Sequence, residues 1–438
     1  MNKVFYWSLV AALAGFLFGF DTVVISGADK KLQALWNSSD VFHGSFVMAM
    51  ALWGTVVGAL FGSIPTHRLG RKKTLWIIGI FYSVSAIGSS LAFDPYIFST
   101  FRFLGGLGVG VSTIAAPAYI SEIAPSQKRG KLVGLYQFNI VFGILMAFLS
   151  NFLLSDIGDN AWRWMLGVEA FPALIFTALV SSIPKSPRWL LMNGKESEAK
   201  KVLQKMDLDE AETDILNKTA INPPSNSRVE LFSLKYRFPM WLTFFIAFFN
   251  QFSGINAFLY YAPRIFEEGG LGENTALLSS VGIGIINLIF TLIGINLIDR
   301  LGRRQLMYYG SFGYIVSLSL VGCAFFFAWE GVLIPIFLFL FIASHAIGQG
   351  AVIWVFISEI YPNHLRNTGQ AFGSSIHWIL AAAIPSFVPF LFASIGVGTV
   401  FMIFAGMMVF QLLFVHFIMP ETKGISLEQL SEKLSSKT

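Results

Sequence analysis

Three ionisable residues lie inside long apolar stretches of this chain of 438 residues, where a charged side chain is costly. Asp21 lies in the first stretch, Arg102 in the fourth and Glu169 in the sixth. A charge at the centre of an apolar helix in lipid costs about 3 kcal/mol or more unless it is paired or hydrated. Each of the three is therefore a candidate for a functional role.

The chemistry that Asp21 and Arg102 could perform is the binding and release of a proton. A carboxylate in an apolar medium favours its protonated form, and a nearby guanidinium favours the ionised form. If a conformational change alters the distance between the two side chains, Asp21 gains and loses a proton in step with that change. A static ion pair that holds two helices together is the alternative. For Glu169, the alternatives are a second titrating group and a carboxylate that reaches toward the outer surface.

Uncharged polar side chains form a second set of candidates. The seventh apolar stretch reads FFNQFSGINAFLYYAP, in which Asn250, Ser253 and Asn256 share roughly one helical face. Amides offer both donors and acceptors to hydroxyl groups, and tryptophan rings cover the apolar faces of sugar rings. The set as a whole favours a neutral, polyhydroxylated ligand over hydrogen bonds between helices alone. Further candidates of this kind are Gln137, Gln251, Tyr260, Tyr261, Asn287, Trp354, His377 and Trp378.

The elements that must position these residues are helices that span a membrane. Hydrophobic residues make up 55% of the chain and charged residues only 13%, against about 25% charged residues in a typical soluble domain. In lipid, a helix satisfies the hydrogen-bonding groups of its own backbone, and a helix of about 20 residues crosses the apolar core of a bilayer. Asp21 inside the first stretch disfavours a cleaved signal peptide. The twelve apolar segments lie at roughly 5–28, 43–65, 74–93, 95–119, 131–154, 162–183, 238–263, 275–299, 304–328, 331–357, 367–395 and 397–418.

The distribution of Lys and Arg predicts the orientation of the chain. With the N-terminus in the cytoplasm, 25 of the 30 Lys and Arg residues lie on that side, and the others are Lys30, Lys31, Arg102, Arg163 and Arg264. Such a bias is typical of cytoplasmic loops. We therefore expect both termini in the cytoplasm and a bacterial-type inner membrane. The net charge of +5 reflects this topology and contact with anionic lipid, and it gives no argument for nucleic-acid binding.

Two motifs occur twice, which indicates an internal repeat. SEIAPSQKRG at 121–130 returns as SEIYPNHLRN at 358–367, and HRLGRKK at 67–73 returns as DRLGRRQ at 299–305, with offsets of 237 and 232. A duplicated chain of membrane helices is typical of transporters whose halves move about a central site. We expect a six-helix bundle at 1–183, a cytoplasmic linker with short helices at 184–237, a second six-helix bundle at 238–419 and a cytoplasmic tail at 420–438.

The linker carries the pattern of an amphipathic helix from Lys195 to Leu216. Its apolar positions recur at helical spacing, and a Pro-Pro-Ser-Asn break follows at 223–226. Cys323 has no second cysteine with which to form an internal disulfide. No serine-histidine-aspartate arrangement, metal-ligand cluster or phosphate loop is evident outside the membrane segments. An enzyme is therefore disfavoured, and we expect neither a metal nor a cofactor other than a coupling proton.

The residues above resemble the sugar porter family of the major facilitator superfamily over essentially the whole chain. GFLFGFDTVVISGA at 15–28 resembles the family's first helix, and NQFSGINAFLYY at 250–261 resembles its seventh. RLGRKK, DRLGRR and the two SEI motifs match its repeated loops. PKSPRWL at 184–190 and PETKG at 420–424 match its markers after helices 6 and 12.

This resemblance implies an all-α membrane protein with twelve helices in two six-helix bundles around a central sugar site. Asp21 stands where proton-coupled members carry Asp, Arg102 matches its partner, and Glu169 matches a carboxylate in helix 6. The resemblance further implies contacts between the bundles on the cytoplasmic side, with Glu122 paired to Arg129 and Glu359 to Arg366, together with Arg68, Arg71, Arg300 and Arg303. The sugar-contacting positions would be Phe18, Gln137, Asn250, Gln251, Asn256, Tyr260, Asn287, Trp354, His377 and Trp378.

The chain departs from the family pattern at several positions. His67 stands where many members have Asp, and Asn250 replaces the first of two glutamines. His377 occupies a position more often filled by Asn or Gln, so a contact sensitive to pH becomes possible. Helix 10 lacks the usual proline-rich stretch, since Gln349, Ala351 and Ile353 stand where prolines often occur, and Ala346 stands where passive members carry Glu.

The sequence therefore predicts a monomeric, proton-coupled importer of a neutral monosaccharide. Its partners would be the sugar, the proton and the lipid bilayer, with no nucleic acid. A passive facilitator of sugar or of a polyol such as inositol is the first alternative. A sugar sensor of transporter-like fold is less favoured, because only a short polar segment follows Pro420.

Overall fold

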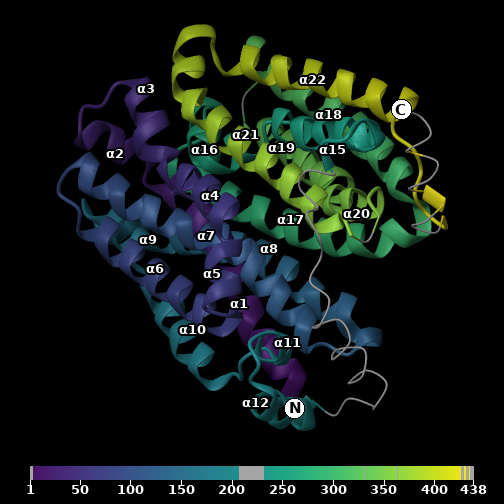
Figure 1. Ribbon diagram of the computed structural model, residues 1–438. Helices are drawn as coiled ribbons and strands as arrows, with labels where there is room; N and C mark the ends of the chain where they lie inside the picture. The colour runs from purple at the N-terminus through teal and green to yellow at the C-terminus, as the bar shows by residue number, and fades with distance from the viewer. Residues whose placement is uncertain are drawn as a thin grey trace. The chain divides into compact units, whose positions relative to one another are not determined.

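The computed structural model describes residues 3–206, 231–329, 331–362, 364–425, 429–430 and 434. All regular elements of these residues are helices (Figure 1), as the sequence predicts. Within the described residues, eleven helical spans, some of them made of two or three of these elements, are long and apolar enough to cross a membrane. A bent pair, Asp40–Met48 followed by Met50–Phe61 at 42°, would make a twelfth crossing. This bend falls inside the segment 43–65 that the sequence predicts as one span.

The chain forms two compact units. Unit 1 comprises Met1–Ile25 and Met50–Pro224, and unit 2 comprises Ser26–Ala49 and Ser225–Thr438. The helices of unit 1 are α1 (Lys3–Val24), α4 (Met50–Phe61), α5 (Ser63–Arg68), α6 (Arg71–Leu91), α7 (Pro95–Ile123), η3 (Ser126–Lys128), α8 (Arg129–Leu154), η4 (Ser155–Ile157), α9 (Ala161–Gly167), α10 (Ala170–Ser182), α11 (Pro187–Met192) and α12 (Glu196–Met206).

Unit 2 takes a piece of the N-terminal half of the sequence. The short turn η1 (Ile25–Gly27) leads into this piece, which then lies against helices from the second half. The helices of unit 2 are α2 (Asp29–Leu35), α3 (Asp40–Phe42), η2 (His43–Met48), η5 (Leu234–Tyr236), α15 (Arg237–Phe252), α16 (Ile255–Glu268), α17 (Glu273–Leu301), α18 (Arg303–Phe326), α19 (Leu333–His345), η6 (Ala346–Gly350), α20 (Ala351–Glu359), α21 (Arg366–Ile395) and α22 (Val397–Phe417).

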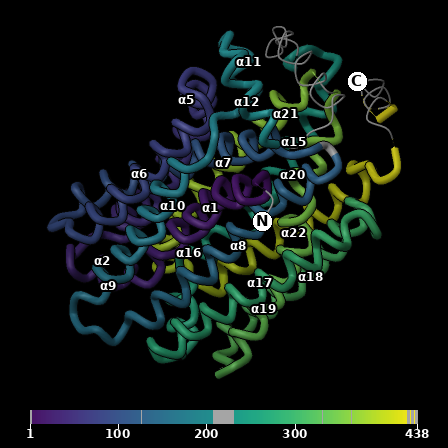
Figure 2. The backbone as a smooth tube through the Cα atoms, turned by 90° about the horizontal axis from the view of Figure 1, so that it is seen from below, coloured from purple at the N-terminus to yellow at the C-terminus, as the bar shows by residue number. Residues whose placement is uncertain are grey.

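Glycines allow the helices of unit 1 to approach closely. In Figure 2, α1 and α8 lie side by side. A Cβ added at Gly19 would lie 1.9 Å from the backbone oxygen of Ile140, and one at Gly143 would lie 2.1 Å from that of Phe16. Since neither backbone atom can move far, these positions require glycine. Small residues at such contacts replace the hydrophobic driving force that helices lack in lipid.

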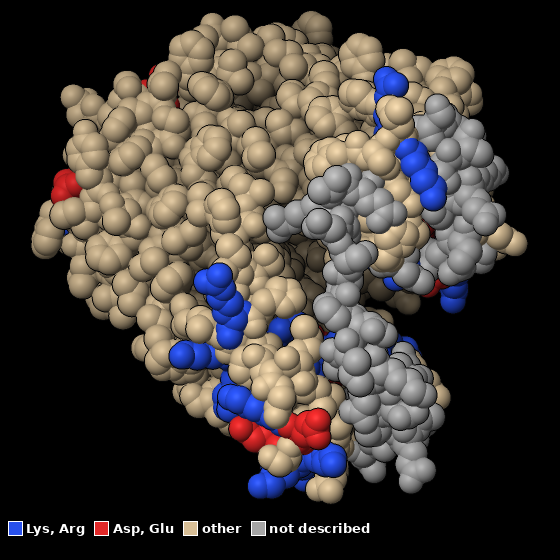
Figure 3. All heavy atoms as spheres, viewed as in Figure 1, with Lys and Arg blue, Asp and Glu red and all other residues tan. Residues whose placement is uncertain are grey.

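The linker helices belong to unit 1. Serine 186 caps α11 by accepting a hydrogen bond from the amide of Trp189. Helix α12 buries Leu203 and Met206 in the same apolar cluster as Val4 of α1. The predicted helix therefore forms as far as Met206, and the rest of that prediction, to Leu216, lies outside the described residues. Lys and Arg side chains gather at the end of unit 1 that carries α11 and α12, whereas most of the surface in this view is uncharged (Figure 3).

The piece 26–49 is held in unit 2 by a group of charged and polar side chains. Asp29 is 2% exposed and lies 2.7 Å from the imidazole of His43, which is fully buried. Arg264 of α16 lies 3.4 Å from the other oxygen of Asp29 and donates a hydrogen bond of 2.6 Å to Gln33. A second ion pair joins Lys30 and Glu267 at 2.6 Å. These contacts join α2 to α16 and to η2.

Candidate functional site

Asp21 and Arg102 meet in unit 1, as the sequence predicts. Helix α1 carries Asp21 and helix α7 carries Arg102, and each residue is 1% exposed. Nη1 of Arg102 lies 2.5 Å from Oδ1 of Asp21, and Nη2 donates to the backbone oxygen of Asp21 at 2.9 Å. One guanidinium therefore holds both the side chain and the backbone of its partner, which fixes their relative orientation.

Gly105 makes room for this pair one helical turn beyond Arg102. A Cβ at Gly105 would lie 2.4 Å from Oγ of Ser85 and 3.4 Å from Oδ1 of Asp21. Gly105 thus leaves space beside the carboxylate of Asp21. Oδ2 of Asp21 and Oγ of Ser85 are buried and have no hydrogen-bond partner among the described residues.

Glu169 joins this group from the sixth span. The hydrogen bonding of that span is irregular where α9 ends at Gly167 and α10 begins at Ala170, and Glu169 lies there with helical φ and ψ angles. The side chain of Glu169 is 1% exposed, so it does not reach the outer surface. It lies near enough to Asp21 and Arg102 for their charges to interact. We call Asp21, Arg102 and Glu169 the acid–arginine cluster.

A break in the seventh span positions the amides of unit 2. Helix α15 ends at Phe252, α16 begins at Ile255, and Gly254 between them has a φ of +80°. A Cβ there would lie 2.5 Å from the ring of Phe404, so glycine is required twice over. The break places Asn250 and Gln251 at the end of one helix and Asn256 in the first turn of the next. This break is absent from the sequence-based prediction, which has a single helix at 238–263.

The three amides contact one another. Nε2 of Gln251 donates to Oδ1 of Asn250 at 2.8 Å, and Nδ2 of Asn256 donates to Oε1 of Gln251 at 2.8 Å. Asn250 and Gln251 are 3% and 1% exposed, whereas Asn256 is only half-buried. We call these residues the amide cluster. Asn256 is the member that retains access to a ligand.

His377 lies between the amide cluster and two tryptophans. Its Nδ1 and Nε2 lie 3.1 and 3.4 Å from Nε2 of Gln251. Its ring centroid lies 5.2 Å from that of Trp354 and 5.0 Å from that of Trp378. Three of the predicted aromatic and imidazole side chains therefore lie together beside the amides, and Trp378 is 6% exposed. Indole rings suit the apolar face of a sugar ring.

The other predicted sugar-contacting residues are less directly connected to this surface. Tyr260 is buried in α16, and Asn287 of α17 is 7% exposed and accepts a hydrogen bond from Thr291 at 3.4 Å. Phe18 of α1 and Gln137 of α8 are half-buried residues of unit 1. Helix η6 is a π-helical turn at 346–350, in the segment that lacks the usual prolines. Such turns widen a helix locally and are frequent at functional sites.

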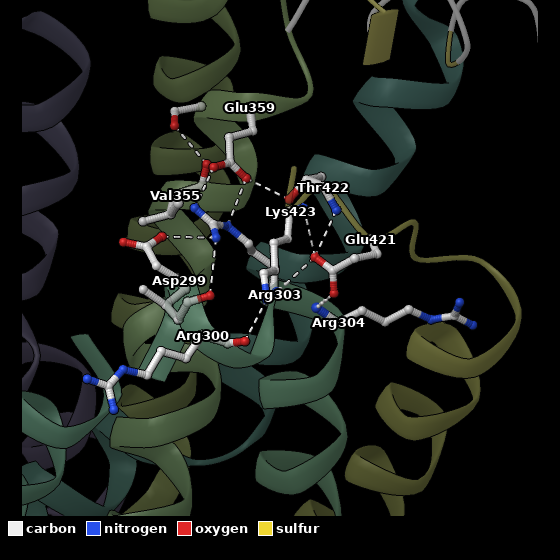
Figure 4. A network of polar contacts seen from close by, with 11 residues as sticks. Asp299, Arg300, Arg303, Arg304, Val355, Glu359, Glu421, Thr422 and Lys423 are labelled. Carbon is white, nitrogen blue, oxygen red and sulfur yellow. Dashed lines mark hydrogen bonds and ion pairs between the residues drawn. The ribbon is translucent and has the colours of Figure 1, made fainter. Parts of the chain in front are cut away.

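A repeated Arg–Glu–hydroxyl arrangement closes one end of each unit. Arg71 binds Glu122 at 2.8 Å in unit 1, and Arg303 binds Glu359 at 2.7 Å in unit 2. A hydroxyl group donates to each glutamate, from Ser186 at 2.5 Å and from Thr422 at 2.6 Å. Figure 4 shows the second of these clusters, in which Glu421 also accepts from the backbone amides of Arg303 and Arg304.

The described ion-pair partners of Glu122 and Glu359 are thus Arg71 and Arg303, and the expected pairs with Arg129 and Arg366 stay predictions. Arg71 and Arg303 follow Gly70 and Gly302, whose positive φ angles of 82° and 96° turn the chain and start the next helix with the arginine beside the glutamate. Arg68, Arg129 and Arg300 are exposed, and Arg366 is partly buried. The sequence-based prediction misses Ser186 and Thr422. Their separation of 236 residues, between PKSPRWL and PETKG, is close to the offsets of the repeated motifs and could have indicated that they correspond.

Comparison with known proteins identifies the family. The profile of the sugar (and other) transporter family matches residues 7–434. The chain belongs to this family. Its members are transporters of the major facilitator superfamily and not enzymes, so the fold and family expected from the repeated motifs are confirmed.

The similar proteins include characterised sugar symporters. The arabinose-proton symporter of Bacillus subtilis is 35% identical, over 99% of this chain and 95% of the relative. The D-xylose-proton symporter of Escherichia coli is 32% identical, over 98% of this chain and 95% of the relative. The inward-open structure of the xylose transporter XylE from E. coli matches with a TM-score of 0.87 at 30% identity, over 98% of this chain and 99% of that structure.

Proposed function

We propose that the protein imports a neutral monosaccharide together with a proton, by alternating access between two six-helix bundles at 1–183 and 238–419. The observation that carries the proposal is the double contact of Arg102 with Asp21, both 1% exposed, beside a third buried ionisable residue, Glu169. The kinship with sugar-proton symporters of B. subtilis and E. coli supports it.

The acid–arginine cluster contains two carboxyl groups and one guanidinium. Arg102 can balance only one carboxylate, and a second ionised carboxylate in an apolar surrounding is costly. With Arg102 on Asp21, Glu169 is the group that holds a proton most easily. When Arg102 moves away from Asp21, Asp21 takes a proton as well. Because the pair joins α1 to α7, a change in the packing of these helices couples proton binding to conformational change.

The sugar would bind against the amide cluster, His377, Trp354 and Trp378. Amides and an imidazole donate to and accept from hydroxyl groups, and the indole rings cover a CH face. Phe18, Gln137, Tyr260 and Asn287 complete the proposed binding set. The surface offers no guanidinium or ammonium group of its own for a carboxylate or phosphate, which favours a neutral ligand.

The Arg–Glu–hydroxyl clusters would serve as the cytoplasmic gate. Each cluster ties its glutamate to the arginine of the preceding loop, at 2.8 Å in unit 1 and 2.7 Å in unit 2. We propose that Arg68, Arg129, Arg300 and Arg366 add contacts between the bundles, as the resemblance to the family implies. We propose that the protein acts as a monomer in the cell membrane with both termini in the cytoplasm, and that the proton is its only coupling ion.

Purified protein in proteoliposomes tests the proposal. Counterflow of labelled hexoses, pentoses and inositol into vesicles preloaded with the unlabelled compound would identify the substrate without a proton gradient. An inward proton gradient should then drive the same substrate above equilibrium, and a protonophore should abolish this accumulation. Counterflow of a sugar that no proton gradient can accumulate would make the protein a passive facilitator. Binding of a sugar without any flux would make it a sensor.

Glu169→Gln separates the two acids. This variant keeps the shape of the side chain and removes its charge, so we expect counterflow close to that of wild type. Accumulation should become less dependent on pH, because one titrating group of the cluster is lost. Equal pH dependence of accumulation in Glu169→Gln and wild type would assign the titration to Asp21 alone.

A further inference from the structure

A continuous chain of hydrogen bonds runs from the amide cluster into the interior of unit 2. Nδ2 of Asn250 faces Oε1 of Gln349 at 3.5 Å, the longest link of the chain. Nε2 of Gln349 donates to Oε1 of Gln411 at 2.9 Å, and Nε2 of Gln411 donates to Oγ of Ser311 at 2.8 Å. Ser311 donates in turn to the backbone oxygen of Met307 at 2.7 Å.

In this series of hydrogen bonds every donor points the same way, and the inner end of the series determines which way. A backbone carbonyl can only accept, so Ser311 donates to Met307 and must accept from the amide nitrogen of Gln411. The amide oxygen of Gln411 is then turned toward the nitrogen of Gln349. The carbonyl of Ile246, 3.4 Å from the same nitrogen of Gln349, is a longer and weaker contact that favours the same orientation.

The orientation of the inner residues passes to the residues at the ligand surface. With the oxygen of Gln349 toward Asn250, the nitrogen of Asn250 faces inward and its oxygen accepts from Gln251. The amide nitrogen of Gln251 then faces both ring nitrogens of His377, at 3.1 and 3.4 Å. An N–H group needs an acceptor there, so this arrangement holds the imidazole in its neutral form.

We propose that Gln349, Gln411 and Ser311 are positioning residues that set the sugar selectivity of the site without touching the sugar. The inference rests on the proposed function. All three are fully buried, and they come from η6, α22 and α18, whereas the amide cluster lies on α15 and α16. They decide which atoms of Gln251, Asn256 and His377 are presented to a hydroxyl group as donors and which as acceptors.

The physical reason for the proposal is the cost of a reversed amide. An amide that rotates by a half-turn exchanges its donor for its acceptor, and a binding site built to pair a hydroxyl group strongly rejects a ligand that leaves buried polar groups unpaired. Without the inner anchor, both orientations of Gln251 become available. A site with two orientations distinguishes less well between a sugar and its epimer.

Ser311→Ala is the sharpest test, because α18 offers a matched control. Ser317 is also fully buried on α18 and also donates to the carbonyl four residues earlier, at 2.7 Å, but among the described residues no glutamine donates to it. The measurement is the ratio of KM values for the best sugar and for its epimer or deoxy analogue, from counterflow in proteoliposomes. We expect Ser311→Ala to lower this ratio about threefold to tenfold and Ser317→Ala to leave it unchanged.

The pH dependence of KM gives a second readout that a merely structural defect would not move. In Ser311→Ala, Gln251 can turn its oxygen to His377 and stabilise the imidazolium. We therefore expect KM to acquire a dependence on pH between about 5 and 7 that wild type lacks. His377→Gln in the same background should remove that dependence. Should Ser311→Ala fail to reach the membrane, Gln349→Met takes its place, because it removes the hydrogen bonds of Gln349 with Asn250, Gln411 and Ile246.

The outcomes separate this inference from the proposed function. If wild type neither binds nor transports any sugar, the proposed function fails and the inference fails with it. If wild type transports a sugar and Ser311→Ala matches both wild type and Ser317→Ala in KM ratio and pH profile, the inference alone is overturned. Agreement of Ser311→Ala and Gln349→Met in a lowered ratio would establish it.

Discussion

Arg102 holds Asp21 through two separate atoms, the carboxylate oxygen at 2.5 Å and the backbone oxygen at 2.9 Å. Removal of one partner of a buried pair leaves an uncompensated charge, which costs about 3–5 kcal/mol. We therefore expect Arg102→Met to lower the stability of the purified protein strongly. The double variant Asp21→Asn, Arg102→Met should be more stable than Arg102→Met alone. Thermal unfolding in detergent measures both, and additive losses would contradict the pairing.

Gly302 should tolerate no side chain. Its φ is +96°, and a Cβ there would lie 2.6 Å from Oε2 of Glu421. Gly396 has a φ of +81°, and no atom of the described residues lies within 4 Å of its Cβ position, so Gly396→Ala measures the backbone strain alone. We expect a loss of about 1 kcal/mol for Gly396→Ala and a larger loss for Gly302→Ala. Equal losses in chemical unfolding would show that the contact with Glu421 carries no weight.

Arg264 should anchor the piece 26–49 to α16. Its partner Asp29 is 2% exposed, whereas Lys30, in the neighbouring pair with Glu267, is 42% exposed. Breaking a buried pair costs about 3–5 kcal/mol, but breaking an exposed one costs about 1 kcal/mol or less. Arg264→Met should therefore increase proteolysis within 26–49 by far more than Lys30→Met. Equal rates of cleavage for the two variants would mean that the apolar contacts alone hold this piece.

His67 predicts a dependence of stability on pH. The pKa of its imidazole lies below its ordinary value, because neighbouring atoms shield the exposed ring in part from water and because the Arg71 cation lies close, with Glu122 acting in the opposite direction. The folded protein thus binds this proton more weakly than the unfolded chain. Stability from this group is complete above about pH 6.5 and is lost as the pH falls below it.

His67→Gln isolates this contribution, because Gln cannot titrate. We expect the free energy of unfolding of wild type to fall more steeply between pH 7 and pH 5 than that of the variant. Asp299 occupies the corresponding position of unit 2, where it lies 3.2 Å from Arg303. Parallel pH profiles for wild type and His67→Gln would contradict this assignment.

The sequence predicts well those features that depend on the cost of burying charge. Asp21, Arg102 and Glu169 are conspicuous in apolar stretches, and the structure brings them together. The repeated motifs likewise lead to the two matching clusters at Arg71 and Arg303. In these cases a residue type is so costly, or a pattern so long, that few arrangements remain possible.

Features that depend on local irregularity are less predictable. The break at Gly254 and the π-helical turn at 346–350 lie within apolar segments that read as continuous helices. Gln349 and Gln411 are isolated amides whose direction within the bundle cannot be read from apolar periodicity, since the segments are apolar all round. The attachment of 26–49 to unit 2 depends on Arg264, more than 200 residues away in the sequence.

The uptake of protons upon addition of sugar tests the central claim most directly. The best sugar is added outside proteoliposomes in weak buffer, with no proton gradient at the start. Potassium and valinomycin clamp the membrane voltage. We predict that the outer medium becomes more alkaline in step with sugar entry for wild type, and that Asp21→Asn carries the sugar in counterflow without this change. Sugar entry into wild-type vesicles at full rate with no movement of protons would contradict the account.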